Sequence, residues 1–290
     1  MDISIIIVSY NTRQILAECL NSVIQQTQGL SYEIIVIDNA SVDGSVEMLR
    51  QEFPGIIVKD NRENRGFSSA NNQGIAIARG DFVFFLNPDT ILLNNAAKLM
   101  MEFIETQKDA GFVGPALYYQ DGRYQPSIGV FSSPLHVLYL YMPFTGFIHN
   151  LYYKYLFSKD KIRNVDWLCG AALLVRRAVL QKVGGFDENF FMYSEEEDLC
   201  LRMKKNGYRL FYFPAAKIIH LKGQSSLDRK SQSNHNFWVS KIKFFKKHYS
   251  ASQIALFKSA FILVIKIKKH IFGKRKDYFT QIEKILKDKL

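Results

Sequence analysis

The sequence predicts an α/β fold with a mostly parallel central sheet, followed by a basic helical C-terminal tail. Short apolar, β-branched runs alternate with helical segments through residues 3–90, which is typical of βαβ crossovers. Charge is also divided unevenly. Of 38 Lys and Arg and 27 Asp and Glu in 290 residues, the segment 221–290 carries 17 basic and 4 acidic side chains. We therefore expect a nearly neutral domain over 1–226 and a cationic extension over 227–290.

Four short apolar runs predict the first strands of the sheet. Ile3 to Ser9 is almost continuously β-branched, as expected of a strand that is covered on both faces. The other strands are expected at 33–38, 56–59 and 82–86. Helices should separate these strands: one capped by Asn11, one over 45–53 and one over 69–79.

The rest of the domain should add another helix and two extended segments. Ser194 and Glu197 have the spacing of a capping box, which predicts a helix that ends at Asn206-Gly207. A strand over 209–213 and an extended segment over 217–221 follow, and the latter carries His220.

Several classes of protein are excluded or disfavoured by composition and motifs. The hydrophobic content of 48% is too high for a disordered chain. The three cysteines, Cys19, Cys169 and Cys200, are widely spaced, which favours a reduced, cytoplasmic compartment over disulfides or a zinc site. We expect neither a signal peptide nor a transmembrane span. The glycine-rich fingerprints of dinucleotide sites and P-loops are absent.

Polar residues follow three of the predicted strands. They are Ser9-Tyr10-Asn11, Asp38-Asn39 and Asn87-Pro88-Asp89. Because ligands of parallel sheets bind beyond the carboxyl ends of the strands, these groups predict a site at one edge. A carboxylate such as Asp38 can bind a base or ribose, and Arg65 beside Gly66 can bind a diphosphate. Asp89 can bind a divalent cation.

Each of these interpretations has a structural alternative. The polar residues could follow the strands simply because loops are exposed to solvent. Asp89 could cap a helix that begins near Leu92, and Arg65 could form a surface ion pair. His220 follows two isoleucines, so it is either a core histidine or a ligand of the cation held by Asp89.

Four consecutive carboxylates, Glu195 to Asp198, form the second candidate centre. Like charges repel, so a partly buried member should have a raised pKa, as a general base requires. Glu197 has a sufficient role in the capping box, and Asp198 can pair with Arg202 one helical turn later. Both interpretations of the cluster, a catalytic site and a solvent-exposed charged surface, remain open at this point.

Taken together, these motifs resemble the family 2 glycosyltransferases, inverting enzymes of the GT-A fold, and in particular their rhamnosyltransferase-like branch. The matching segments occur in the family's order over about residues 1–226. They are 8–11, 37–45, 64–67, 71–74, 86–90, 166–171, 184–187, 195–202 and His220 ahead of Ser225-Ser226.

The resemblance implies roles for individual residues. Tyr10, Asp38 and Arg65 would hold the base, ribose and diphosphate of a nucleotide-sugar. Asp89 and His220 would bind a divalent cation, Mg²⁺ or Mn²⁺. Glu196 stands where the family has its catalytic base, with Glu195 as the alternative. The substrate-binding candidates are Ser9, Tyr10, Asn11, Asp38, Asn39, Arg65, Gly66, Asn71, Asn87, Trp167, Gly170 and Asp198.

Two departures from the family pattern affect this assignment. Asn87 stands where many members have the first Asp of the metal motif, although Asn-Pro-Asp is common in this branch. Glu196 replaces the usual Asp, which lengthens the base by one methylene. The implied partners are a dTDP-, UDP- or GDP-sugar donor and a glycan or lipid-linked acceptor in cell-surface polysaccharide synthesis.

Two segments of the chain could contact the acceptor or a membrane. Residues 124–160 begin with a long uncharged run rich in Tyr and Phe, which suits a lipid-linked acceptor, a membrane interface or a protein core. In the tail, Lys258, Lys266, Lys268 and Lys269 flank an apolar helical face. We expect this helix either to lie on an anionic membrane at its cytoplasmic face or to pack on the domain.

Other functions compete with sugar transfer. A nucleotidyltransferase shares a similar sheet, but its glycine-rich, lysine-bearing loop is missing and the carboxylate cluster would have no task. A non-catalytic, membrane-associated nucleotide-sugar-binding protein would retain the fold. Nucleic-acid binding by the basic tail is not expected, because no recognisable motif accompanies the charge.

Overall fold

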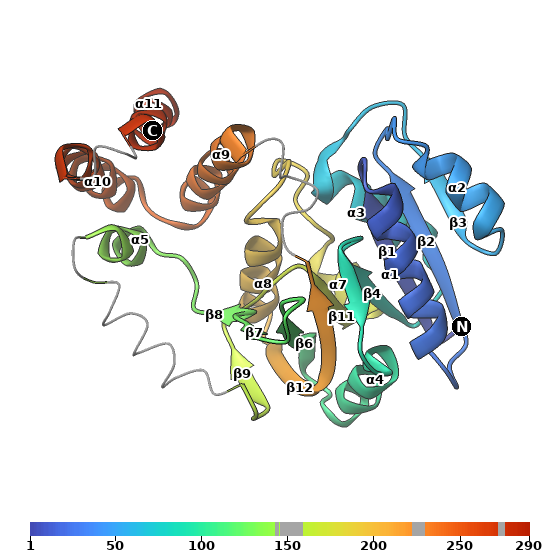
Figure 1. The fold of residues 1–290 in the computed structure, drawn as a ribbon. Helices are drawn as coiled ribbons and strands as arrows, with labels where there is room; N and C mark the ends of the chain where they lie inside the picture. Colours follow the sequence, from blue (N-terminus) through green and yellow to red (C-terminus); the bar gives the residue numbers. More distant parts are fainter. Residues whose placement is uncertain (143–144, 146–158, 222–229, 272–275) are drawn as a thin grey trace. The chain divides into compact units, whose positions relative to one another are not determined.

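The computed structural model describes the whole chain except residues 143–144, 146–158, 222–229 and 272–275 (Figure 1). The chain divides into two compact units. The first comprises Met1–Val130, Lys159–Phe191 and Glu195–Leu227, and the second comprises Phe131–Ser158, Met192–Ser194 and Asp228–Leu290. The boundary expected at 226/227 stays a prediction. The second unit contains two internal segments in addition to the C-terminal residues.

The first unit is built around a mixed sheet, which confirms the α/β prediction. Its strand order is β3-β2-β1-β4-β11-β6-β12-β5. The strands are β1 (Ile3–Ser9), β2 (Tyr32–Asp38), β3 (Ile57–Asp60), β4 (Phe82–Leu86), β5 (Thr90–Leu92), β6 (Ala110–Tyr118), β11 (Ala172–Arg176) and β12 (Arg209–His220). The first four are parallel to one another, whereas β11 runs antiparallel to β4 and β5 runs antiparallel to β12. Short strands β7 (Tyr124–Gln125) and β9 (Arg163–Val165) pair with β6 and β12, and β8 (Ile128–Gly129) pairs with β10 (Trp167–Leu168).

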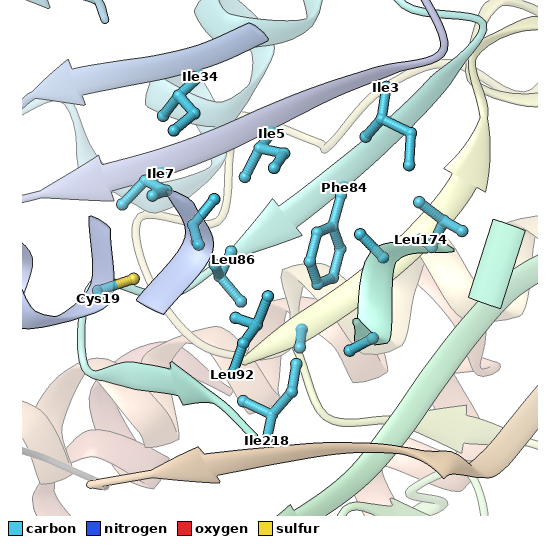
Figure 2. Packing of buried hydrophobic residues seen from close by; sticks show 14 of the residues in the cluster. Ile3, Ile5, Ile7, Cys19, Ile34, Phe84, Leu86, Leu92, Leu174 and Ile218 are labelled. Atoms are coloured by element: carbon cyan, nitrogen blue, oxygen red, sulfur yellow. The ribbon is translucent and has the colours of Figure 1, made fainter. Parts of the chain in front are cut away.

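Six helices accompany this sheet in the described part of the first unit. They are α1 (Arg13–Gln26), α2 (Ser45–Glu52), α3 (Gly66–Ile77), α4 (Ala96–Thr106), α7 (Arg177–Val183) and α8 (Glu195–Lys205). Alternate residues of β1 point into one core beside Phe84 of β4 and Leu174 of β11 (Figure 2). Ile5, Phe84 and Leu174 are completely buried, which is the reason that these strands are apolar throughout.

Cys19 lies in the same core and is fully buried. Burial raises the pKa of its thiol to about 12, so the side chain stays protonated. Cys19, Cys169 and Cys200 form no disulfide with one another.

Several local predictions were wrong. Asn11 does not cap α1: its backbone is left-handed, with φ 53°, and its Oδ1 accepts from the Val42 amide at 2.8 Å. The helix expected near Leu92 is strand β5 instead, and Asn95 caps α4. Asp89 is therefore not a helix cap.

The prediction of a capping box formed by Ser194 and Glu197 was also wrong. Ser194 adopts a left-handed conformation with φ 63°, and its buried Oγ has no hydrogen-bond partner within the described part of the chain. The helix itself forms as α8 and ends one residue before Asn206. The two extended segments expected before His220 are one long strand, β12.

The second unit is helical. It contains α5 (Pro134–Tyr141), α9 (Lys230–His248), α10 (Ala251–Ile271) and α11 (Lys276–Lys289). Aromatic side chains form its centre: the Tyr141 ring lies 5.5 Å from Trp238 and 4.9 Å from Phe261, both edge-on. Of the aromatic segment 124–160, residues 143–144 and 146–158 lie outside the described residues.

An ion-pair cluster joins two of these helices. Glu283 of α11 accepts from Lys269 of α10 at 2.5 Å and pairs with Lys287 at 2.7 Å. These hydrogen bonds lower the pKa of Glu283 to about 2. Among the helices that the structure describes, none has the length and apolar content needed to span a bilayer.

Candidate active site

The carboxyl ends of the parallel strands meet at one edge of the sheet. Ser9 at the end of β1 pairs in register with Asp38 at the end of β2, and β4 ends beside them at Leu86. The next residue, Asn87, donates its amide to the Ala171 carbonyl at 2.9 Å, which brings the segment before β11 to the same edge. Polar groups from four parts of the chain therefore surround this edge.

Asp38 is fully buried, and only one of its carboxylate oxygens accepts a hydrogen bond from the described residues. Oδ1 accepts from the Ser41 amide at 2.7 Å, while Oδ2 has no hydrogen-bond partner among the described residues. Burial raises the pKa of this carboxyl, and the bonds from Ser41 oppose that rise. A buried acceptor without a partner is costly unless a ligand or water satisfies it, so Oδ2 suits a ligand's N–H or O–H.

Asn39 links Asp38 to the loop before α3. Its Nδ2 donates to the Gly66 carbonyl at 3.2 Å, and its Oδ1 accepts from Asn61 at 3.0 Å. Gly66 has φ 80°, and a Cβ at this position would lie 2.5 Å from the Phe191 carbonyl oxygen. Only glycine fits this turn, which presents Arg65 immediately before it.

Arg65 extends into solvent, with about half of its side chain exposed, and its Nε lies 3.6 Å from Glu63. At that distance and exposure the pair is weak, so the guanidinium can turn to an anionic ligand. Asn71 instead has a structural contact: its Nδ2 donates to the Phe67 carbonyl at 2.9 Å, inside α3.

The residues after β1 chiefly shape the loop that follows β2. The Asn11 backbone amide donates to Ser41 Oγ at 2.8 Å, and the Asn11 side-chain oxygen accepts from the Val42 amide. Ser9 Oγ and Thr12 Oγ1 lie 3.0 Å apart. Tyr10, between them, is half-buried.

Asp89 and His220 are brought together from positions far apart in the sequence. β5 and β12 pair so that Thr90 lies opposite His220, and the Leu221 amide donates to the Asp89 carbonyl at 2.9 Å. His220 Nε2 consequently lies 3.4 Å from Asp89 Oδ1, and both side chains are more than nine-tenths buried.

Gln125 fixes the histidine ring, although no motif in the sequence indicates this role. Its Nε2 donates to the His220 carbonyl at 3.2 Å, so its Oε1 faces His220 Nδ1 at 2.7 Å as an acceptor. In a neutral ring, Nδ1 would then carry the proton, and Nε2 would present a lone pair on the side of Asp89. A neutral imidazole beside a carboxylate is a donor set that fits a divalent cation.

The described residues contain no cluster of three or more His, Cys, Asp or Glu side chains that could hold a metal ion. Asp89 and His220 would supply two ligands. Mg²⁺ commonly uses one or two protein carboxylates and completes its shell with water and substrate phosphates, so a two-ligand protein site is compatible with it. Asn87 Oδ1, two residues before Asp89, is buried without a hydrogen-bond partner in the described part of the chain.

The carboxylates of α8 differ in exposure. Glu195, Glu197 and Asp198 are at least nine-tenths buried, whereas Glu196 is half-buried. A Cβ on Gly170 would lie 3.4 Å from the Glu196 side chain, so Gly170 leaves room beside this carboxylate. Gly170 also directly precedes Ala171, which bonds Asn87 at the sheet edge.

Two further candidates, Asp198 and Trp167, differ in their burial and hydrogen bonds. Asp198 is completely buried and accepts from Arg202 Nε at 2.8 Å, and Arg202 also donates to the Gly185 carbonyl at 2.6 Å. This arrangement matches the structural alternative expected for Asp198. Trp167 is half-buried on β10, and its buried Nε1 lacks a hydrogen-bond partner among the described residues.

Comparisons with known proteins are consistent with this geometry. A family model described as "Glycosyl transferase family 2" matches residues 4–184. An N-acetylglucosaminyl-diphospho-decaprenol L-rhamnosyltransferase of Mycobacterium tuberculosis is 30% identical over 209 residues, which are 67% of this chain and 67% of the relative. Rhamnosyltransferase WbbL of Escherichia coli is 28% identical over 223 residues, 74% of this chain and 82% of the relative.

A solved structure resembles the fold over nearly the whole chain. It is a mannosyltransferase from Pyrobaculum calidifontis in complex with GDP-Man and Mn²⁺, matched with a TM-score of 0.61 and 14% identity. The match covers 98% of this chain and 84% of that chain. At this identity the likeness supports the fold alone.

Proposed function

Because the chain belongs to glycosyl transferase family 2 and has the GT-A fold, we propose that it is an inverting enzyme acting on a nucleoside-diphosphate sugar. The sugar, which we infer to be rhamnose, would pass to a hydroxyl of a glycan or lipid-linked acceptor during cell-surface polysaccharide synthesis. The two similar rhamnosyltransferases support this choice, and the name of one includes a lipid diphosphate acceptor.

One observation carries the proposal. A single edge of the sheet gathers a buried carboxylate with an unused oxygen, an aspartate–histidine pair and a partly exposed glutamate. These are the groups needed to bind a nucleotide, hold a cation and accept a proton. They are Asp38, Asp89, His220 and Glu196.

The donor would be held by residues at the ends of β1 and β2 and in the loop after β3. Asp38 Oδ2 would accept from the base or ribose, and the half-buried Tyr10 would pack beside it. Arg65 would bind the diphosphate through its guanidinium, which forms charge-assisted and bidentate bonds to phosphate oxygens. Gly66 and Asn39 would hold the turn that presents Arg65.

Asp89 and His220 would hold Mg²⁺ or Mn²⁺. When bound, the cation would stabilise negative charge on the departing diphosphate. Within the chain, Gln125 keeps the proton on His220 Nδ1, and Asp89 contributes a carboxylate that is already at the sheet edge.

Glu196 would act as the base. It takes the proton of an acceptor hydroxyl, whose oxygen forms a bond to the anomeric carbon while the bond from that carbon to the diphosphate oxygen breaks. The bonding electrons leave with the nucleoside diphosphate. Attack from the face opposite the leaving group inverts the anomeric configuration. Gly170 lies directly beside Glu196, so a substrate would meet backbone and not a side chain at this position.

A donor panel tests the proposed activity. With Mn²⁺ or Mg²⁺, the protein is incubated with dTDP-rhamnose, UDP-sugars and GDP-sugars, and release of the nucleoside diphosphate is measured. We expect dTDP-rhamnose to be consumed, and faster with an N-acetylglucosaminyl-diphospho-lipid as acceptor. Turnover of another sugar alone would contradict the rhamnose assignment. Binding without turnover of any donor would favour the non-catalytic alternative, and pyrophosphate-dependent release would favour a nucleotidyltransferase.

We also propose that the helical unit binds an anionic membrane surface at the cytoplasmic face. The apolar face expected for α10 is divided in two: Phe257, Phe261, Val264 and Ile265 are buried among the helices. Leu256, Leu263, Ile267 and Ile271 form a second stripe at helical spacing, each more than 40% exposed. Lys266 lies exposed on the same helix, so an apolar stripe with a nearby basic group supports lipid binding.

Binding to vesicles tests this surface. We expect the protein to bind phosphatidylcholine vesicles only when phosphatidylglycerol is included. The double variant Leu256→Ser, Leu263→Ser should bind at least about 10²-fold more weakly, because burying each leucine is worth on the order of 1.5–3 kcal/mol. Ile24→Ser with Leu93→Ser is the matched control, since both residues are comparably exposed but lie in the first unit. Equal binding by wild type and the α10 variant would refute the proposal.

A further inference from the structure

Two helices of the first unit carry groups that must meet in the proposed reaction, and they pack on different halves of the sheet. α3 begins directly after Arg65, the proposed diphosphate ligand, and packs on β1 and β2. α8 carries Glu196 in its first turn and packs on β6 and β12. Strands β4 and β11 lie between these two pairs of strands in the sheet. Sugar transfer therefore requires a fixed spacing of two helices that have separate supports.

The loop after α7 is bonded to α3 by one side chain. Asn72 of α3 accepts from the Phe186 amide at 2.9 Å through Oδ1, and its Nδ2 donates to the Phe186 carbonyl at 2.8 Å. The same Nδ2 donates to Glu188 Oε1 at 2.9 Å. A Cβ on Gly185 would lie 2.4 Å from Asn72 Oδ1, so this close approach requires glycine. A single amide of α3 thereby pairs with both backbone groups of Phe186.

The aromatic rings at this position attach the loop to α3 a second time. Phe186 is 5% exposed, and its ring packs edge-on against Phe67 of α3 and Phe85 of β4, with centroids 6.1 and 5.1 Å apart. Further along the loop, the Phe191 carbonyl accepts from the Phe67 amide at 2.7 Å. The loop is therefore held against α3 at both Phe186 and Phe191.

Arg202 bonds the same loop to α8. Its guanidinium donates to the Val183 carbonyl at 3.0 Å and to the Gly185 carbonyl at 2.6 Å. Its Nε donates at 2.8 Å to Asp198, a completely buried carboxylate one turn earlier on α8. The planar guanidinium reaches these acceptors from one fixed orientation, which the single ammonium group of a lysine cannot do. The buried charge of Asp198 holds Arg202 in that orientation.

We propose that Asn72, Asp198 and Arg202 are positioning residues, which join α3 to α8 through the loop after α7. Asn72 holds the loop from one helix and Arg202 holds it from the other, so the loop fixes Glu196 relative to the Arg65 end of α3. This inference rests on the proposed roles of Arg65 and Glu196. Asp198, expected among the substrate-binding residues, would act through the loop and not by touching substrate.

Asn72→Ala and Arg202→Lys test this assignment in the full-length protein. Each removes bonds to the loop and leaves Arg65 and Glu196 in place. With the dTDP-, UDP- and GDP-sugar panel and the N-acetylglucosaminyl-diphospho-lipid acceptor, we expect kcat for nucleoside diphosphate release to fall about tenfold, since small misplacements can cost about 10²-fold. KM for the donor should change less than about twofold, because the donor-binding groups stay on their own helix and strands.

Asn95→Ala is the matched control. Like Asn72, Asn95 donates to a backbone carbonyl, that of Gln28 at 2.8 Å, and accepts from a backbone amide, that of Lys98 at 3.3 Å. These bonds cap α4 and do not involve the loop after α7. Because a helix cap is lost, thermal unfolding should shift to lower temperature, while kcat should stay within about twofold of wild type.

Double variants separate positioning from general stability. In a Glu196→Gln background, Asn72→Ala should cause no further loss of kcat, because the group that it positions is already inactive. Loss of the same factor in both backgrounds would overturn the proposal, as would unchanged kcat in both Asn72→Ala and Arg202→Lys. Thermal unfolding and donor binding verify that each variant is folded, and Arg202→Lys decides alone if Asn72→Ala does not fold. Full activity of Glu196→Gln, or turnover of no donor by wild type, would instead refute the proposed function on which the assignment rests.

Discussion

Glu196→Gln lowers kcat of sugar transfer by about 10²–10⁴-fold, the range typical of losing a general base. Glutamine has nearly the same shape but cannot accept the proton of the acceptor hydroxyl. Glu196 is the half-buried member of the α8 cluster, and Gly170 leaves space beside it. Nucleotide-sugar binding, measured by calorimetry, should be unchanged, because Asp38 and Arg65 remain in place. A fall in kcat with constant donor affinity is the expected signature.

Glu195→Gln is the matched control for this experiment. Glu195 is adjacent, carries the same charge and is 5% exposed, so it has less access to an acceptor. We expect its kcat to remain within about tenfold of wild type, as for a residue that affects the base indirectly. The reverse result would assign the base to Glu195. Undiminished kcat in both variants would show that neither carboxylate is the base.

The strands could be predicted because their apolar, β-branched composition leaves few alternatives. β1 and β4 are buried on both faces, so tertiary packing and local preference favour the same structure. The position of the polar residues that follow these strands is then a consequence of the parallel arrangement, which places Asp38 and Asn87 at one edge of the sheet. This part of the candidate site is a consequence of topology.

Local conformations near the site could not be predicted, because tertiary contacts outweigh local preference there. Asn11 and Ser194 are good caps by composition, but both adopt left-handed backbones. Asn11 is used to hold Val42 in the neighbouring loop. Ser194 belongs to the segment Met192–Ser194, in which the Met192 carbonyl accepts from Ser240 of α9. Departures from local rules are expected near functional sites, where strain can serve positioning.

Gln125 was missed for a different reason. It lies on the two-residue strand β7, and a single glutamine in a polar stretch carries no periodic or motif signal. Its role depends on the pairing of β6 with β7 and of β6 with β12, which joins residues 95 positions apart. Only the folded arrangement identifies it as the partner of His220.

Asp89→Asn lowers kcat by about 10²–10³-fold, comparable to removing one preorganised group that stabilises developing charge. Asparagine keeps the size of the side chain but loses the charge needed to hold a divalent cation opposite His220. The activity of wild type should rise with Mn²⁺ to saturation, whereas Asp89→Asn should require far more Mn²⁺ or fail to saturate. Gln125→Leu, which leaves His220 Nδ1 without its acceptor, should weaken the Mn²⁺ response by about 10–100-fold.

The structure provides a control that separates this effect from a general change of charge. Asp109 is also an aspartate in an ion pair, with Arg209 at 2.6 Å, but it is exposed and belongs to no predicted site. Asp109→Asn should leave both kcat and the Mn²⁺ response unchanged. If Asp89→Asn responded to Mn²⁺ as wild type does, Asp89 would not be a cation ligand. If Asp89→Asn lost its Mn²⁺ response while Gln125→Leu kept it, Asp89 would bind the cation without a contribution from the oriented histidine ring.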